Sequence, residues 1–242
     1  MNTELLANYG PKILSGMIVT LQLVLTSAVI GAVFALPLAM VRNSRFSFFR
    51  GLAKAYIVFF RGTPLLGQVF LIYYGAGQIR GELTSLGVWW FFRDAYLCAI
   101  FAFTLNTIAY QAEILRGALS SLPRGQLEAA NSLGLPRATT LFQILLPQAL
   151  IMALRPLGNE LILSLKASAL ASVITVPELM QATKLAFSRS FDFQVYIWAA
   201  VIYLVMVETV RRIWSVLEWY LTRHLRHRVT PVTQPSIALQ KA

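Results

Sequence analysis

The sequence predicts an all-α integral membrane protein with five transmembrane helices. Only 13% of its 242 residues are charged and 57% are hydrophobic, whereas about 25% of the residues in a typical soluble domain are charged. A helix needs about 20 mostly apolar residues to cross a bilayer. Five stretches of the chain carry no charge at all: 13–41, 62–79, 95–112, 138–154 and 193–207. These observations exclude a soluble enzyme, a disordered protein and a disulfide scaffold.

Breaks in the apolar pattern define the individual spans. Pro37 predicts a kink near the end of the first span, and Gly62 with Pro64 predicts an interruption within the second. An aromatic cluster at 89–92, of the kind found at membrane interfaces, precedes the third span, and Pro147 suits the first turn of the fourth. The expected spans are 16–41, 51–74, 95–115, 147–166 and 194–217, all within a transmembrane domain at 13–218.

The distribution of Lys and Arg predicts the orientation of the chain. With the N-terminus outside, 13 of these residues lie inside and six lie outside, and cytoplasmic loops of membrane proteins carry the excess of positive charge. The segment 1–12 is therefore expected outside, whereas the loop 120–143 and the basic tail 219–242 are expected in the cytoplasm. The tail is expected to contact anionic lipid headgroups.

Several kinds of active site are absent from the sequence. Cys98 is the only cysteine, so neither an intrachain disulfide nor a Cys-based metal cluster is possible. The only histidines, His224 and His227, lie in the Arg-rich tail, which leaves none for a catalytic triad and disfavours a metal pair. One glycine-rich stretch has the spacing of a phosphate-binding loop, but Gln68 stands where that loop requires Lys. We therefore expect no catalytic residue, no metal site and no cofactor on this chain.

The loop between the third and fourth spans contains a specific motif. Glu128, Ala129 and Ala130 are followed after three residues by Gly134, and after nine more by Ile-Leu-Leu-Pro at 144–147. This spacing resembles the EAA signature of ATP-binding-cassette (ABC) import permeases at every defining position. Small alanines allow close contact with a partner surface, and glycine permits a sharp turn into a second short helix. The resemblance implies that Glu128, Ala129, Ala130 and Gly134 couple the chain to an ATPase; an ordinary amphipathic loop is the alternative.

The resemblance extends over nearly the whole chain. The stretches Arg-Gly-Thr-Pro-Leu-Leu at 61–66 and Gly-Asn-Glu-Leu at 158–161 are similar to the polar amino acid permease family. Phe-Arg-Asp-Ala-Tyr at 92–96 and Thr-Leu-Asn-Thr at 104–107 are most similar to histidine and opine uptake systems. The segment Lys-Ala-Ser-Ala-Leu at 166–170 departs from the usual pattern of the family, which leaves the substrate less defined than the subunit.

The resemblance implies a type-1 ABC importer permease fold in the bacterial inner membrane. It implies a subunit that carries a polar, preferably basic, amino acid or an arginine-derived opine. The expected partners are two cytoplasmic ATP-binding subunits, which hold ATP and Mg, a second and related permease chain, a periplasmic binding protein and the lipid bilayer. No nucleic acid is expected. A secondary transporter or channel that is not coupled to ATP is the alternative, and a membrane-embedded enzyme fits the sequence least well.

Glu160 is the principal candidate for contact with the substrate. Ionisable groups within a bilayer are energetically costly and usually face protein or a transport pathway. With Asn159 beside it and Ser164 one turn further on, Glu160 could receive a guanidinium, an imidazolium or an α-ammonium group. The alternative is a structural ion pair with Arg61 or Arg155.

Two further groups of polar residues are candidates for the substrate path. The Gly-x-Pro break frees backbone groups that protein or a polar cavity must satisfy, so Thr63 and Gln68 are expected to line the route. In the third span, Asn106, Tyr110 and Glu113 recur at helical spacing and form one polar face. Hydrogen bonding between helices explains that face equally well.

Two acids outside these groups are expected to have other roles. Glu208 precedes Arg211 and Arg212 by about one turn, which predicts an internal ion pair. Glu178 follows the fourth span, and we expect a solvated loop acid there rather than a residue of the external mouth.

Overall fold

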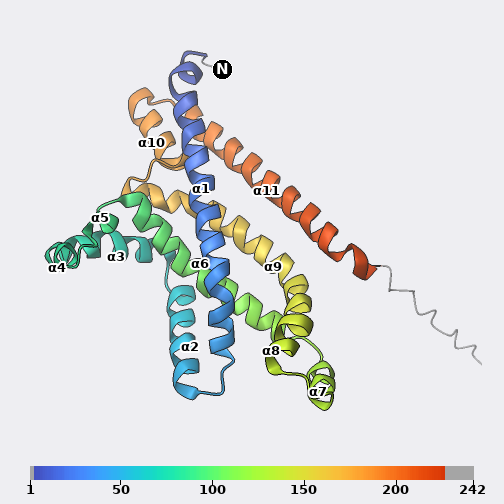
Figure 1. The fold of residues 1–242 in the computed structure, drawn as a ribbon. Coiled ribbons are helices and arrows are strands. Elements are labelled where there is room, and N and C mark those ends of the chain that lie inside the picture. Colours follow the sequence, from blue (N-terminus) through green and yellow to red (C-terminus); the bar gives the residue numbers. More distant parts are fainter. Residues whose placement is uncertain (1–2, 227–242) are drawn as a thin grey trace, which may run out of the picture.

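The structure, a computed structural model, describes residues 3–226 of the chain, and the side chains of residues 7–223 (Figure 1). The expectations for the basic tail beyond Arg226, including His227, lie outside the described residues. Within residues 3–226 every regular element is a helix. The elements are α1 (Thr3–Arg42), α2 (Ser47–Gly62), α3 (Leu65–Gln78), α4 (Arg80–Ser85), α5 (Trp89–Phe92), α6 (Ala95–Ser120), α7 (Arg124–Ser132), α8 (Arg137–Thr139), the π-helical η1 (Thr140–Leu145), α9 (Leu146–Ala167), the 3-10 helix η2 (Ser168–Ile174), α10 (Leu179–Ser190) and α11 (Gln194–Arg226).

The helices that could cross a membrane match most of the expected spans. α1 from Ala7, α6, and the continuous helical stretch Arg137–Ile174 that contains α9 are long and apolar enough. α2 and α3 pass the same test together, as one span bent by 103°. The fifth expected span, 194–217, lies within the 33-residue α11, which is not among these helices. The five-span topology therefore stays a prediction.

α6 crosses the second half of α1 obliquely at the centre of the molecule, and the two helices pack closely there (Figure 1). Small side chains let the neighbouring helices approach α6 closely: Ala99, Ala102, Ala109 and Ala112 are all fully buried. At Gly31 of α1, a Cβ atom would lie 2.9 Å from a methyl carbon of Thr107. Close backbone approach through small residues is the usual way in which helices associate in a membrane, where burial of apolar surface gives little driving force.

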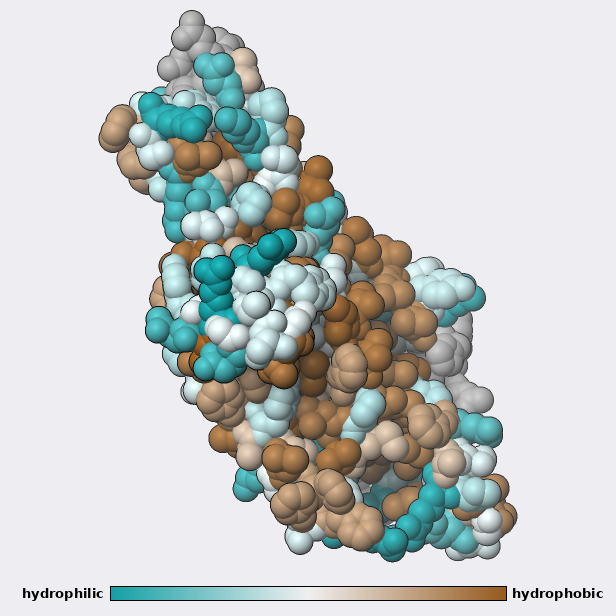
Figure 2. Space-filling model, turned by 60° about the vertical axis from the view of Figure 1, so that its left-hand side comes forward, coloured by the Kyte–Doolittle hydropathy of each residue, from teal (hydrophilic) through white to brown (hydrophobic). Residues whose placement is uncertain are grey.

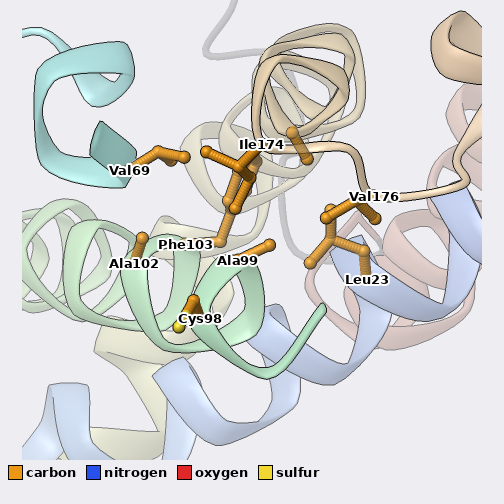
Figure 3. Close-up of a cluster of buried hydrophobic side chains, with 9 residues drawn as sticks. Leu23, Val69, Cys98, Ala99, Ala102, Phe103, Ile174 and Val176 are labelled. Atoms are coloured by element: carbon orange, nitrogen blue, oxygen red, sulfur yellow. The ribbon is translucent and has the colours of Figure 1, made fainter. Parts of the chain in front are cut away.

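Hydrophobic clusters join these two helices to the rest of the chain. Figure 3 shows one of them, in which Leu23 of α1, Val69 of α3, Phe103 of α6 and Ile174 of η2 meet. This cluster holds η2 and α3 against the central pair. Toward the end of the molecule that carries α7, which we call the α7 end, a second cluster joins α1, α6 and α9. Apolar side chains also cover much of the middle of the face shown in Figure 2, as expected for a surface in contact with lipid.

The predicted interruption of the second span is confirmed. α2 ends at Gly62, Thr63 is extended with ψ 148°, and α3 begins after Pro64. Proline disfavours a helical conformation in the residue before it, which explains why the break occurs there. Side chains satisfy the carbonyl groups that the break exposes. Gln68 Nε2 donates to the Phe60 and Thr63 oxygens at 2.9 and 3.2 Å, and Asn106 Nδ2 also donates to the Phe60 oxygen at 2.9 Å.

The predicted surroundings of Glu208 are confirmed, whereas those of Glu178 are not. Both guanidinium groups beside Glu208 pair with its carboxylate, at 2.8 and 2.7 Å, which confirms the internal ion pair. The prediction of a solvated Glu178 was wrong, because this side chain is 0% exposed. It caps the N-terminus of α10, and α1 covers it so closely that a Cβ on Gly16 would lie 3.0 Å from the Glu178 backbone.

Candidate translocation site and coupling surface

A cavity of about 270 Å³ with both polar and apolar walls lies where the α2–α3 break, α6 and α9 meet. We call it the Glu160 cavity. Five residues that the sequence analysis selected line it: Thr63, Asn106, Tyr110, Glu160 and Ser164. Pro64, Leu65, Leu163 and Ala167 complete the wall. Apolar and small residues of this kind are indistinguishable in the sequence from the rest of a membrane span, so no pattern could have selected them.

Glu160 is buried in this cavity without a cationic partner. Its side chain is 7% exposed, and the hydroxyl of Ser164 donates to Oε1 at the long distance of 3.4 Å. Neither of the two arginines proposed as alternative partners forms a salt bridge with Glu160. Arg155 pairs with Glu218 of α11 at 2.6 Å, and the guanidinium of Arg61 lies over the Tyr110 ring at 5.1 Å from its centre. Among the described residues, no Lys or Arg nitrogen lies within 4 Å of Glu160.

The remaining two candidates lie outside the lining. Gln68 is buried behind the cavity, where its amide donates to Thr63 Oγ1 at 2.9 Å and accepts from Asn106 Nδ2 at 3.1 Å. It therefore holds two lining residues in place across the helix break. Asn159 is exposed and does not line the cavity. Neighbouring residues on an α-helix point about 100° apart, so Asn159 and Glu160 cannot face the same side of α9.

The motif predicted to couple the chain to an ATPase lies at the α7 end (Figure 1). Glu128 and Ala129 are exposed on α7, whereas Ala130 is buried. Gly134 ends the helix with φ +67°, a conformation that other residues rarely adopt. Leu133 beside it is 77% exposed, and sequence reasoning did not select it. An exposed apolar residue next to a motif for partner contact is a signal that could have been used.

A pair of amide side chains connects α7 to α9. Gln126 Nε2 donates to Gln148 Oε1 at 2.9 Å, and Gln148 Nε2 donates back to Gln126 Oε1 at 3.0 Å. Gln148 also donates to the carbonyl oxygen of Ile144 at 2.8 Å, which fixes its position at the start of α9. Glu160 lies further along the same helix, so this pair joins α7 to a helix that lines the cavity.

Several transport permeases are similar to this chain over most of its length. The nopaline transport system permease protein NocM of Agrobacterium fabrum is 40% identical over 230 residues, which cover 95% of each chain. The octopine transport system permease protein OccM of Rhizobium radiobacter is 43% identical over 86% of this chain and 85% of its own length. The arginine ABC transporter permease protein ArtM of Escherichia coli is 35% identical over 82% and 89%, respectively.

Solved structures agree with the fold. An amino acid ABC transporter crystallised with histidines contains a chain that is 36% identical, with a TM-score of 0.77 over 88% of this chain and 95% of that chain. The MetNI methionine ABC transporter in an inward-facing conformation has a TM-score of 0.73 over 88% and 97%, respectively, at 19% identity, and so supports the fold alone. These comparisons confirm the helical ABC permease fold and the resemblance to polar amino acid and opine permeases. Residues 27–217 match one family over most of the chain, and the protein therefore belongs to the binding-protein-dependent transport system inner membrane component family.

Proposed function

We propose that this chain forms half of the membrane pathway of an ATP-driven importer, and that Glu160 receives the cationic group of a basic amino acid or an arginine-derived opine. The observation that carries the proposal is a buried carboxylate that faces a cavity without a counter-ion. An ionisable side chain in the membrane has an insertion penalty of at least about 2.5–3.5 kcal/mol. A bound guanidinium or ammonium would offset that penalty by supplying the missing charge.

The relatives support a guanidinium as the recognised group. Nopaline, octopine and arginine, for which the three related permeases are named, all contain one. Asn106 and Tyr110 provide neutral polar groups on the α6 wall of the cavity, which suits the remainder of such a molecule. We assign the hydrogen-bonded pair of Gln68 and Thr63 to support of that wall.

The other subunits of the transporter are inferred from the family, whose members work with ATPase and substrate-binding partners. We propose two cytoplasmic ATP-binding subunits, which hold ATP and Mg, a second and related permease chain, and a periplasmic binding protein. In the proposed orientation the N-terminus is periplasmic and the α7 end is cytoplasmic, as the excess of Lys and Arg favours. The exposed face of α7, with Glu128, Ala129 and Leu133, would then lie against an ATPase subunit.

The proposed coupling is mechanical. Closure of the ATPase pair displaces α7, the Gln126–Gln148 pair transmits the displacement to α9, and the Glu160 cavity opens alternately to the two sides of the membrane. Such coupling requires that the state of the ATPases change the relative stability of the two membrane conformations.

Labelled uptake by Glu160→Gln tests the substrate role. The panel holds arginine, histidine, lysine, glutamine, glutamate, octopine and nopaline, supplied to a strain that lacks this permease and carries the restored gene, with and without ATP depletion. Loss of a charged hydrogen bond of about 1.5–3 kcal/mol should raise the half-saturating concentration of the transported compound about tenfold to a hundredfold. Glu82→Gln, which removes an exposed acid of α4, is the matched control. Unchanged concentration dependence in a normally assembled Glu160→Gln complex would disprove the role.

Gly134→Pro tests the coupling surface. Proline holds φ near −65°, whereas Gly134 has φ +67°, so the turn after α7 cannot form. We expect transport to fall at least about tenfold while the ATPases either detach or hydrolyse ATP without transport. Gly134→Asn, which tolerates positive φ, should retain most of the activity. Normal transport by the proline variant would count against coupling through α7.

A further inference from the structure

A second polar pocket lies next to the Glu160 cavity, toward the α7 end. It has a volume of about 320 Å³ and is enclosed by the end of α1, by α2 and by α6. We call it the cationic pocket. Its polar lining comprises Arg42, Lys54, Arg61, Tyr110 and Glu113. Tyr110 lines both this pocket and the Glu160 cavity, so the two spaces adjoin.

Three positive charges in this pocket form no salt bridge with any residue that the structure describes. Among the described residues, no carboxylate lies within 4 Å of the side-chain nitrogens of Arg42, Lys54 or Arg61. Arg61 is held by its contact with the Tyr110 ring, a cation–π interaction that leaves the edge of the guanidinium available for hydrogen bonds. Cations that converge without acidic partners form a binding site for an anion.

The single acid of the pocket does not cancel this charge. Glu113 Oε1 accepts from Arg116 Nε at 2.9 Å on the same helix, so its charge is already neutralised. Its other oxygen, Oε2, is buried and has no hydrogen-bond partner among the described residues. The net charge that the pocket presents is therefore that of its three cations.

We infer that the cationic pocket binds the carboxylate groups of the substrate after they leave the Glu160 cavity, and that it favours a guanidino compound with two carboxylates over one with a single carboxylate. This inference rests on the proposed function. Three cations can neutralise more than one carboxylate, so the pocket favours a substrate that has two. Glu160, by contrast, contacts only the cationic group of the substrate. Arg61 lies two residues from Thr63, which lines the Glu160 cavity, so the α2–α3 break contributes a residue to each space.

A cysteine reporter tests the charge of the pocket without any assumption about Glu160. Val58 lines the pocket and is 59% exposed, whereas Cys98, the only native cysteine, is buried. In the purified complex with Val58→Cys, an anionic thiosulfonate reagent should react about tenfold faster than a cationic one of similar size. Adding Arg61→Gln should reduce that ratio severalfold, and adding Arg50→Gln, on the same helix outside the pocket, should not. Equal rates for both reagents would overturn the inference.

Protection of the same cysteine identifies the anion. Octopine, which has two carboxylates, should slow modification more than arginine, and agmatine, which has none, should have no effect. The measurement is made in phosphatidylcholine vesicles with and without phosphatidylglycerol. Protection by the anionic lipid alone would assign the pocket to a lipid headgroup and would overturn the substrate assignment.

Uptake separates this inference from the proposed function. Lys54→Gln and Arg61→Gln should reduce the maximal rate for octopine about tenfold and that for arginine less, whereas Glu160→Gln should raise the half-saturating concentration for both. A further outcome is that Glu160→Gln leaves the half-saturating concentrations unchanged while octopine still protects Val58→Cys from modification. That result would disprove substrate binding by Glu160 but would support anion binding in the cationic pocket. An equal loss for octopine, arginine and agmatine in Arg61→Gln would show a structural role and overturn the inference.

Discussion

Glu160 and Glu178 are two buried carboxylates of one chain with opposite surroundings. Glu178 accepts hydrogen bonds from the Met180 and Gln181 backbone at 2.9 and 2.8 Å, and from the Tyr203 and Thr20 hydroxyls at 3.0 and 3.3 Å. Glu160 accepts one long bond and faces a cavity.

The difference separates a structural acid from an acid available for recognition. Four donors from α1, α10 and α11 satisfy Glu178 within the fold, and its complete burial leaves no access for a ligand. Burial raises the pKa of the Glu178 carboxyl, and the hydrogen bonds oppose that shift. Glu160 keeps most of its acceptor capacity unused, which is the state expected of a group that acquires its partner only when substrate arrives.

The largest effect on stability is expected from Glu178→Ala. The change removes the cap of α10, worth about 1 kcal/mol, and leaves the buried Thr20 hydroxyl unsatisfied at about 1–3 kcal/mol, while the half-buried Tyr203 hydroxyl also loses its acceptor. The thermal unfolding temperature of the purified complex should therefore drop by several degrees, while the molecules that remain folded keep a normal half-saturating concentration. If Glu178→Ala unfolded at the same temperature as Glu82→Ala, the structural role of Glu178 would be contradicted.

The second prediction is that the substitution of Glu160 impairs transport without lowering stability. Glu160→Gln should leave the unfolding temperature unchanged or raise it, because a buried carboxylate without a counter-ion destabilises the fold. Only transport should suffer. A fall in unfolding temperature as large as that of Glu178→Ala would mean that Glu160 also has a structural role.

The smallest effects should come from the hydroxyl groups beside each acid. Ser164→Ala removes a 3.4 Å hydrogen bond and should raise the half-saturating concentration for substrate only about twofold to fivefold, without a change in unfolding temperature. Thr20→Val removes a buried group that donates to Glu178 and accepts from the Leu179 backbone, so it should lower the unfolding temperature but not alter transport. If Ser164→Ala and Thr20→Val unfolded at the same temperature, the two acids could no longer be assigned different roles.

The sequence predicted those features that depend on local chemistry. The break between α2 and α3 follows from Gly62 and Pro64, and the turn after α7 follows from Gly134. The polar residues of three separate spans meet at the Glu160 cavity because uncompensated polar groups in a membrane must face one another or a pathway.

Features that depend on distant contacts were not predictable in this way. Glu178 is buried because Gly16 and Thr20, more than 150 positions earlier, bring α1 against it. Gln68 supports the cavity from behind because the carbonyl groups of the break attract its amide. Which polar residue lines a cavity and which supports it depends on the angle at which α3 leaves α2, and no spacing in the sequence encodes that angle.

The link between α7 and α9 consists of two neutral amides. Neither glutamine titrates, and neither carries a charge that dissolved ions can screen. The strength of this link is therefore independent of pH and ionic strength. In the proposed complex, the connection between α7 and the membrane path would therefore stay the same while the salt concentration around it changes.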